Sequence, residues 1–230
     1  MPSVSGRVLS LTFEETISAW VVVLPRGTDG WMLSDQGDRS IESWLAFEDL
    51  ISPQTAVAVN GGYFTSDGLP DGLWLVDGVT RQAVSGKSVL SGLVVIDESG
   101  RMSLRPRGAS LDDAAVAFQA GPWILDPGGS FGIRGPDGPL AKRTILAQTE
   151  SSGTLVIRLS EATLYDAARL VEAMGREMPE LRAERALNMD GGPSSGLFID
   201  LENPRVVLPP RGLIHHVLFL EPTVTANQPD

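Results

Sequence analysis

The chain is organised around one stretch, Ala186-Leu187-Asn188-Met189-Asp190-Gly191-Gly192-Pro193-Ser194-Ser195-Gly196-Leu197-Phe198. An apolar run leads into an Asn and an Asp, two glycines, a proline and two serines follow, and an apolar run resumes. Paired glycines let the backbone take positive φ and approach a ligand closely. A carboxyl group and two hydroxyls on such a turn can bind a ligand or act on it, and functional residues concentrate on loops of this kind. A plain strand-to-strand turn is the alternative, and it would be the better interpretation of an isolated Asp-Gly-Gly.

A second loop of similar chemistry, Asn60-Gly61-Gly62-Tyr63-Phe64, follows a predicted strand at residues 55–59. If the strands before the two loops are neighbours, Asn60 and Asp190 share one crevice. Between the loops along the chain lies Lys142-Arg143-Thr144, a basic pair that enters a strand. The planar guanidinium of Arg143 suits phosphate. An ordinary exposed arginine is the alternative.

Composition narrows the class of protein. The 230 residues fit one large domain or two small ones, and the formal net charge of −11 argues against a nucleic-acid partner. The absence of cysteine excludes disulfides, thiolate catalysis and cysteine-based zinc sites. The longest apolar run, residues 19–24, has the length of a strand and not of a membrane span. Residues 1–7 lack a signal-peptide pattern, which leaves the cellular location open.

The pattern of apolar residues predicts many strands and few helices. A short helix is expected at residues 40–50 with Ser40 as its N-cap, and the main helix runs from a Ser160 cap to Pro179. The glycine-rich residues 126–139 are expected to form an exposed loop. Predicted strands cover residues 4–13, 18–24, 55–59, 73–76, 92–96, 102–104, 114–118, 145–148, 155–159, 197–200 and 213–220. We therefore expect a single α+β domain with a mixed or mostly antiparallel sheet.

A serine hydrolase is a competing interpretation. Gly192-Pro193-Ser194-Ser195-Gly196 matches G-x-S-x-G with Ser194 as nucleophile, and Asp200 and His215 or His216 follow in hydrolase order. A nucleophile elbow needs a helix after the serine, whereas the sequence after Gly196 predicts a strand. The adjacent histidines of a strand should also point to opposite faces. The context therefore argues against this interpretation.

The sequence predicts no metal and no cofactor. Two neighbouring histidines without cysteine argue against zinc, and no G-x-G-x-x-G lies between a strand and a helix. Bound calcium is the alternative, because four carboxylates lie in glycine-rich turns, although no EF-hand spacing is present. These are Asp67, Asp71, Asp126 and Asp137.

Three ordered motifs together resemble the phosphodiester glycosidase family. They are Ala58-Val59-Asn60-Gly61-Gly62-Tyr63-Phe64, Lys142-Arg143-Thr144, and residues 186–195. The family's domain occurs in the lysosomal uncovering enzyme, which removes N-acetylglucosamine from a mannose-phosphate diester. The likeness covers about residues 55–220 of a domain that we take to span residues 1–230. Departures are Pro193 and residues 145–147, where the family commonly has glycine. The family is mostly exported.

The resemblance implies hydrolysis of a sugar-1-phosphate diester, or a related glycoside, at the anomeric carbon. Asp190 would be the catalytic carboxylate, as acid or as nucleophile, and Arg143 would hold the phosphate. The loop glycine amides would donate N–H groups, and Asn60 with Ser194 or Ser195 would orient the sugar. The expected catalytic residues are Asp190, Asn60 and Arg143. The expected substrate-binding residues are Gly61, Gly62, Tyr63, Thr144, Asn188, Gly191, Gly192, Ser194 and Ser195.

Two other classes of function remain open from the sequence. One is a non-catalytic module that binds a carbohydrate or polymer with the same loops, and the other is a structural domain of the cell envelope or spore. The expected partner of either a glycosidase or a module is a carbohydrate or sugar-phosphate. Asp71 and Glu150 are weak candidates for a partner carboxylate to Asp190.

Overall fold

The computed structural model describes residues 4–151, 153–201 and 205–222. Its strands form three sheets in which every pairing is antiparallel. We name each sheet after one of its strands. In order, the β12 sheet contains β1 (Arg7–Phe13), β2 (Ile17–Leu24), β12 (Thr154–Ala162), β11 (Ala141–Thr149), β13 (Ala183–Asn188) and β10 (Trp123–Leu125).

The other two sheets have five strands each. The β4 sheet contains, in order, β15 (Arg205–Leu208), β14 (Leu197–Asp200), β4 (Val57–Asn60), β16 (His216–Leu220) and β3 (Trp31–Asp35). The β7 sheet contains β6 (Val79–Gln82), β5 (Trp74–Val76), β9 (Ala114–Ala120), β7 (Gly92–Asp97) and β8 (Met102–Pro106). The prediction of a single α+β domain with mostly antiparallel strands and few helices is confirmed.

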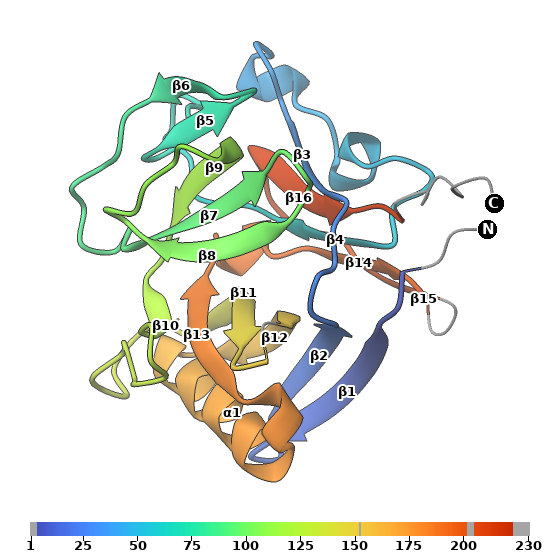
Figure 1. Cartoon of the computed structure of the whole chain (residues 1–230), viewed down its shortest axis with the longest axis vertical. Helices are drawn as coiled ribbons and strands as arrows, with labels where there is room; N and C mark the ends of the chain where they lie inside the picture. The colour runs from blue at the N-terminus through green and yellow to red at the C-terminus, as the bar shows by residue number, and fades with distance from the viewer. Residues whose placement is uncertain (1–3, 152, 202–204, 223–230) are drawn as a thin grey trace, which may run out of the picture.

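The β12 sheet is covered on both faces. Helix α1 (Leu164–Glu177) lies against its outer face at the bottom of Figure 1, and the two smaller sheets lie in the upper half. Ile145 and Ile157 pack with the apolar residues of α1, whereas Leu146 and Val156 pack with residues of the β4 and β7 sheets. Double coverage explains why Leu155-Val156-Ile157 of β12 are consecutive apolar residues instead of alternating with polar ones.

Helix α1 begins later than the sequence predicts. The N-cap is Thr163, whose hydroxyl accepts the Asp166 N–H at 3.0 Å while the Asp166 carboxylate accepts the Thr163 N–H at 3.1 Å. Ser160, the predicted cap, still belongs to β12, and its hydroxyl accepts the Ser18 N–H at 2.9 Å. The chain stays extended through Ala162 because that residue pairs with Ala141 of β11.

The predicted helix at residues 40–50 is wrong. The structure has two short 3₁₀-helices, η1 (Ile41–Ser43) and η2 (Phe47–Leu50), separated by extended backbone at Trp44. The buried side chain of Gln36 accepts the Leu45 N–H at 2.8 Å and donates to the Leu45 carbonyl at 3.0 Å. These hydrogen bonds occupy backbone groups that a continuous helix would need. The remaining 3₁₀-helices are η3 (Pro179–Leu181) and η4 (Gly192–Ser194).

Four short strands were not predicted from the sequence, namely β3, β6, β10 and β15, whereas the strand expected before the Asp190 loop is β13. Residues 126–139 contain no named strand or helix and are mostly exposed, as predicted. None of the described helices has the length and apolar character needed to cross a bilayer. The ends of β4 and β13 bring the two glycine-pair loops to the boundary between the β12 and β4 sheets.

The assignment of Thr163 as the N-cap of α1 can be tested by substitution. We expect Thr163→Ala to lower the free energy of unfolding by about 1 kcal/mol, because the Asp166 N–H at the helix start loses its acceptor. Thr163→Ser keeps a hydroxyl and should restore most of the loss. Urea denaturation of the three proteins makes the measurement. Equal stability of the alanine variant and the wild type would contradict the capping box.

Candidate active site

The two glycine-pair loops meet through backbone hydrogen bonds, although β4 and β13 belong to different sheets. The Asp190 N–H donates to the Gly61 carbonyl at 3.0 Å. The Asn60 amide donates to the Asp190 carbonyl at 2.7 Å. A third hydrogen bond brings in β11, whose Thr144 hydroxyl donates to the Asn60 side-chain oxygen at 2.7 Å. The three motifs singled out in the sequence therefore form one cluster.

Asn60 and Thr144 are buried in this cluster, with 1% and 0% of their surface exposed. The Asn60 oxygen also accepts the Gly196 N–H at 3.1 Å, so both polar atoms of its side chain have partners inside the protein. The Thr144 carbonyl accepts the Met189 N–H at 2.8 Å. This geometry favours a positioning role for both residues over direct contact with a substrate.

The amides of the first glycine pair are already occupied. The Gly61 N–H donates to the His216 carbonyl at 2.9 Å, and the Gly62 N–H donates to the His216 ring nitrogen Nε2 at 2.8 Å. The N–H groups of Gly61 and Gly62, which were expected to be donors to a substrate, therefore already have partners within the protein. A Cβ on Gly61 would lie 2.0 Å from the His216 ring, so glycine is required here by close packing.

The second glycine pair is different. The Gly191 N–H donates to the Asp190 carboxylate at 2.8 Å. The Gly192 N–H has no hydrogen-bond partner among the described residues. Gly192 has a φ of +60°, and no atom lies within 4 Å of the position that a Cβ would take. Of the four glycine amides, that of Gly192 is the one free to meet a ligand.

The carboxyl group of Asp190 lies in a largely buried position. Burial raises its pKa from 3.8 to about 6, and hydrogen bonding by the Ser194 side chain and the Gly191 N–H opposes the rise. The Ser194 hydroxyl has one proton and two nearby acceptors, Asp190 and the Leu213 carbonyl. The bond to Leu213, at 2.9 Å, has the defined geometry, so we assign the proton to it in the absence of ligand.

Arg143 is a buried cation without a counter-ion. It is 7% exposed, and no carboxylate of the described residues forms a salt bridge with it. Its Nε donates to the Ala162 carbonyl at 3.0 Å and one terminal nitrogen donates to the Pro139 carbonyl at 2.6 Å. The other terminal nitrogen lies 3.6 Å from the position of a Cβ on Gly191. Burial lowers the pKa of Arg143, which shows the cost of an unpaired buried charge.

The phenol of Tyr63 interacts electrostatically with both Asp190 and Arg143. Burial and the nearby Asp190 charge raise the pKa of the Tyr63 phenol, and Arg143 opposes the rise. The phenol donates to the Gly121 carbonyl at 2.8 Å and accepts from the Asn188 amide at 2.8 Å. The Asn188 oxygen and the Ser195 hydroxyl are buried without a hydrogen-bond partner. Buried polar atoms of this kind are normally satisfied by an ordered water or a ligand.

The histidines do not form a catalytic triad with Ser194. His215 and His216 do not point to opposite faces as expected: their Nδ1 atoms are 3.1 Å apart and both rings pack on Trp74. Strand β16 begins at His216, so strand alternation does not apply to His215. The Nε2 atom of His216 accepts from Gly62, and Asp200 forms an ion pair with Arg205.

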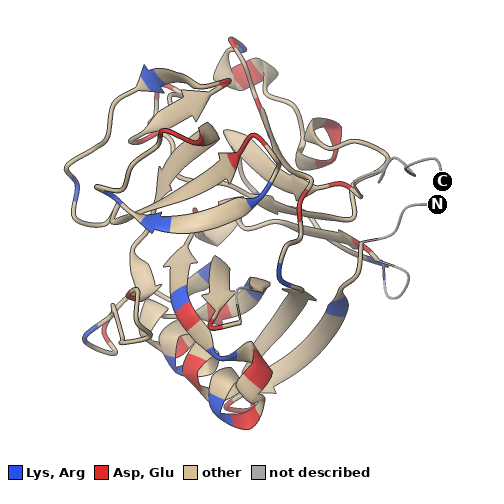
Figure 2. Cartoon of the chain, viewed as in Figure 1, with Lys and Arg blue, Asp and Glu red and all other residues tan. Residues whose placement is uncertain are grey.

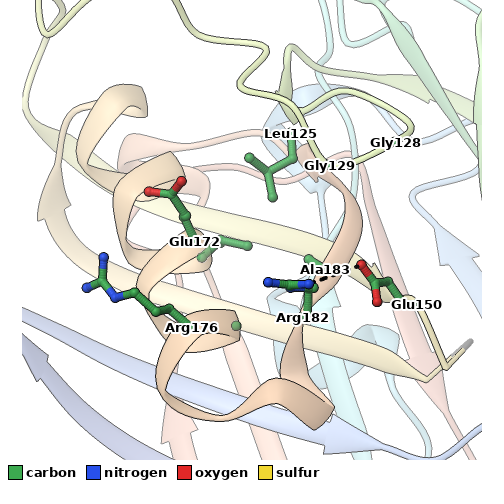
Figure 3. Close-up of a pocket in the computed structure, with 10 residues that line it drawn as sticks. Leu125, Gly128, Gly129, Glu150, Glu172, Arg176, Arg182 and Ala183 are labelled. Carbon is green, nitrogen blue, oxygen red and sulfur yellow. Dashed lines mark ion pairs between the residues drawn. The ribbon is translucent and has the colours of Figure 1, made fainter.

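The weak candidates for a partner carboxylate lie elsewhere. Glu150 follows the far end of β11, seven residues and about 20 Å from Arg143 along the strand. It lines a cavity of about 390 Å³ beside α1, where it faces Arg182 at 4.0 Å (Figure 3). Asp71 is paired with Lys87 at 2.6 Å. Among the described residues, no three His, Asp or Glu side chains are grouped for a metal ion.

Comparisons with known proteins give one family model that matches the chain and several solved structures with a similar fold. The family model for phosphodiester glycosidase matches residues 53–213. The structure is similar to the catalytic domain of zebrafish N-acetylglucosamine-1-phosphodiester alpha-N-acetylglucosaminidase, auto-inhibited by its pro-peptide, with a TM-score of 0.63 and 16% identity over 96% of this chain and 84% of that one. A hypothetical protein from Synechocystis has a TM-score of 0.57 and 14% identity over 95% of this chain, which spans 62% of that one. No curated protein sequence matches the chain.

The close packing of Gly61 is open to test by substitution. We expect Gly61→Ala to lower the free energy of unfolding by about 3 kcal/mol, because the added methyl overlaps the His216 ring. Gly86→Ala is the matched control, since no atom lies within 4 Å of its added methyl. Chemical denaturation measures both variants. Similar stability of the two would show that the His216 ring is not seated against Gly61.

The buried carboxyl group of Asp190 predicts a pH-dependent stability. Between about pH 4 and pH 6 the folded protein keeps a proton that the unfolded chain releases, so stability falls as pH rises through this range. Asp190→Asn removes the charge and should raise the free energy of unfolding at pH 7.5 by about 2 kcal/mol. At pH 3.5 the same substitution should give no gain. Urea denaturation at the two pH values provides the measurement, and a gain of the same size at both would refute the raised pKa.

Proposed function

The chain belongs to the phosphodiester glycosidase family, and we propose that it hydrolyses a sugar-1-phosphate diester at the anomeric carbon. One observation carries the proposal. A carboxyl group with a raised pKa, Asp190, and a buried unpaired cation, Arg143, flank the same glycine loop without forming an ion pair. Such a loop can hold a phosphate next to a reactive carboxylate.

Arg143 is the group that binds the phosphate in this proposal. Two of its nitrogens are fixed by the carbonyls of Ala162 and Pro139, so the direction of the guanidinium is set before a ligand arrives. A preset donor of this kind loses little side-chain entropy on binding. The remaining terminal nitrogen and the free Gly192 N–H both lie on the Gly191 side of the loop and can donate to phosphate oxygens.

Asp190 acts in its ionised form. No carboxylate contributes to the shift in its pKa, which supports a mechanism with a single carboxylate. A phosphate monoester is a good leaving group and needs no proton from a general acid. The bond from C1 to the phosphate oxygen breaks, its electron pair leaves with the phosphate, and an Asp190 oxygen or a water deprotonated by Asp190 forms the new bond to C1. In the first route, water then hydrolyses the glycosyl ester.

The other predicted site residues divide into two groups. Asn60 and Thr144, together with Gly61 and Gly62, fix the backbone on which Asp190 lies. Tyr63, Ser194 and the buried oxygens of Asn188 and Ser195 are the groups available to a sugar hydroxyl or to the attacking water. This division leaves the chemistry itself to Asp190 and Arg143.

Sugar release from a set of sugar-1-phosphate diesters and aryl glycosides tests the proposal. The wild type should release free sugar, with a kcat/KM that rises with pH and levels off above about pH 6 as Asp190 ionises. Asp190→Asn should lower kcat/KM by about 10³-fold or more. Asp137→Asn, a change of an exposed loop carboxylate, is the matched control and should have no effect.

Each contrary result points to a different function. Binding of a diester by calorimetry without sugar release would identify a carbohydrate-binding module. A kcat/KM that falls as pH rises through about 6 would make Asp190 a general acid. Release of a carboxylic acid from an aryl ester would indicate a serine hydrolase that uses Ser194. Full activity of Asp190→Asn would remove the central residue of the proposal.

A further inference from the structure

Beyond Arg143, three more basic residues lie on chain segments next to the Asp190 loop. Lys142 lies on β11, Arg158 on β12, and Arg211 on the segment between β15 and β16. Along α1, by contrast, residues of both charge signs alternate (Figure 2). We call Lys142, Arg158 and Arg211 the cationic cluster.

Backbone geometry fixes this cluster to the loop. The N–H groups of Arg211 and Gly212 donate to the Pro193 carbonyl at 2.8 and 2.9 Å. The Lys142 carbonyl lies 3.1 Å from the position of a Cβ on Gly191. Arg158 stands opposite Thr144, which in turn accepts the Met189 N–H. Three separate segments of the chain therefore place a cation beside the loop that carries Asp190.

None of the three cations forms a salt bridge with a carboxylate of the described residues. The Nε of Arg158 is buried and has no hydrogen-bond partner. Glu161 faces Lys142 across the β11–β12 pair, and its charge raises the pKa of Lys142. Burial lowers the pKa of both Lys142 and Arg158, and the charge of Arg211 lowers each further, so the cations repel one another.

A protein with a formal net charge of −11 has carboxylates to neutralise such a cluster, yet the cluster is left unpaired. Unpaired cations that repel one another destabilise the free protein, and a bound anion relieves the repulsion. The Arg143 guanidinium lies beside Gly191 and is held there by two carbonyls, whereas the backbone of Arg211 is hydrogen-bonded to Pro193, two residues further along the loop. The loop therefore has more unpaired cations beside it than one phosphate bound at Arg143 requires.

We propose that the cationic cluster is a second phosphate subsite, so that the preferred substrate carries a further phosphate beyond the diester that is cleaved. The substrate class is then a sugar-phosphate conjugate or polymer with repeated phosphates. This inference rests on the proposed function, because it assigns the first phosphate to Arg143. It adds a substrate preference that hydrolysis of a simple diester does not require.

The test compares two diesters of the same sugar-1-phosphate, one with methanol and one with the monophosphate of ethylene glycol, which adds a second phosphate. The wild type should have the higher kcat/KM for the second compound. Arg211→Gln and Arg158→Gln should each reduce that preference by about tenfold, and added salt should reduce it further. Arg176→Gln, a change in the cavity beside α1, is the control and should leave the preference unaltered.

The outcomes separate this inference from the proposed function. Equal kcat/KM for the two diesters in the wild type, or a preference that survives Arg211→Gln and Arg158→Gln, would overturn the second subsite and leave the hydrolase intact. Failure of the wild type to release sugar from either diester would overturn the hydrolase. Calorimetry with the same two compounds would then test the subsite alone, since tighter binding of the two-phosphate compound must depend on Arg211 and Arg158.

Discussion

The buried side chain of Asn60 is the constraint on which the rest of the site depends. Its amide donates to the Asp190 carbonyl, and its oxygen accepts from Thr144 and from the Gly196 backbone. The side chain of Asn60, at the end of β4, thus connects Thr144 of β11 with both ends of the Asp190 loop. A buried polar group left without a partner costs about 1–3 kcal/mol, so loss of any one of these hydrogen bonds destabilises the cluster. The position of the Asp190 loop is therefore coupled to the docking of the β4 sheet on the β12 sheet.

The site around Asn60 also contains charged side chains that have no ion-pair partner within the fold. Asp190 is buried with a raised pKa, Arg143 is buried without a carboxylate partner, and the two do not pair with each other. Each arrangement destabilises the protein on its own, and functional sites are where such arrangements are found. An ion pair between Asp190 and Arg143 would relieve both, but it would fill the space and cancel the charge that a phosphate needs. The separation of the two groups is the feature that makes the loop suited to a substrate.

The sequence singled out the two glycine-pair loops and the basic pair, which the structure brings together, but not the residues around them. Asn60, Arg143 and Asp190 were singled out because glycine pairs and a basic pair at strand ends are seldom needed for structure alone. The role of His216 could not be predicted, since its contact with Gly62 joins residues 154 positions apart and depends on how β16 pairs with β4. The α+β class followed from many short apolar runs. The interruption of the predicted helix at residues 40–50 could not be predicted from the sequence. It depends on tertiary hydrogen bonds between Gln36 and Leu45 that outweigh local helix propensity.

Net charge was the weakest guide to the partner. A net charge of −11 predicts that the molecule as a whole repels polyanions. This prediction applies to binding over a large surface and not to a single small site. At distances beyond about 8 Å in physiological salt the far carboxylates are screened, so a ligand at the Asp190 loop responds to the cations beside it. Lys142, Arg143, Arg158 and Arg211 supply four such cations from three chain segments. An acidic protein can therefore attract a phosphate-rich ligand at one site and repel it over the rest of its surface. Binding is then confined to the site next to Asp190.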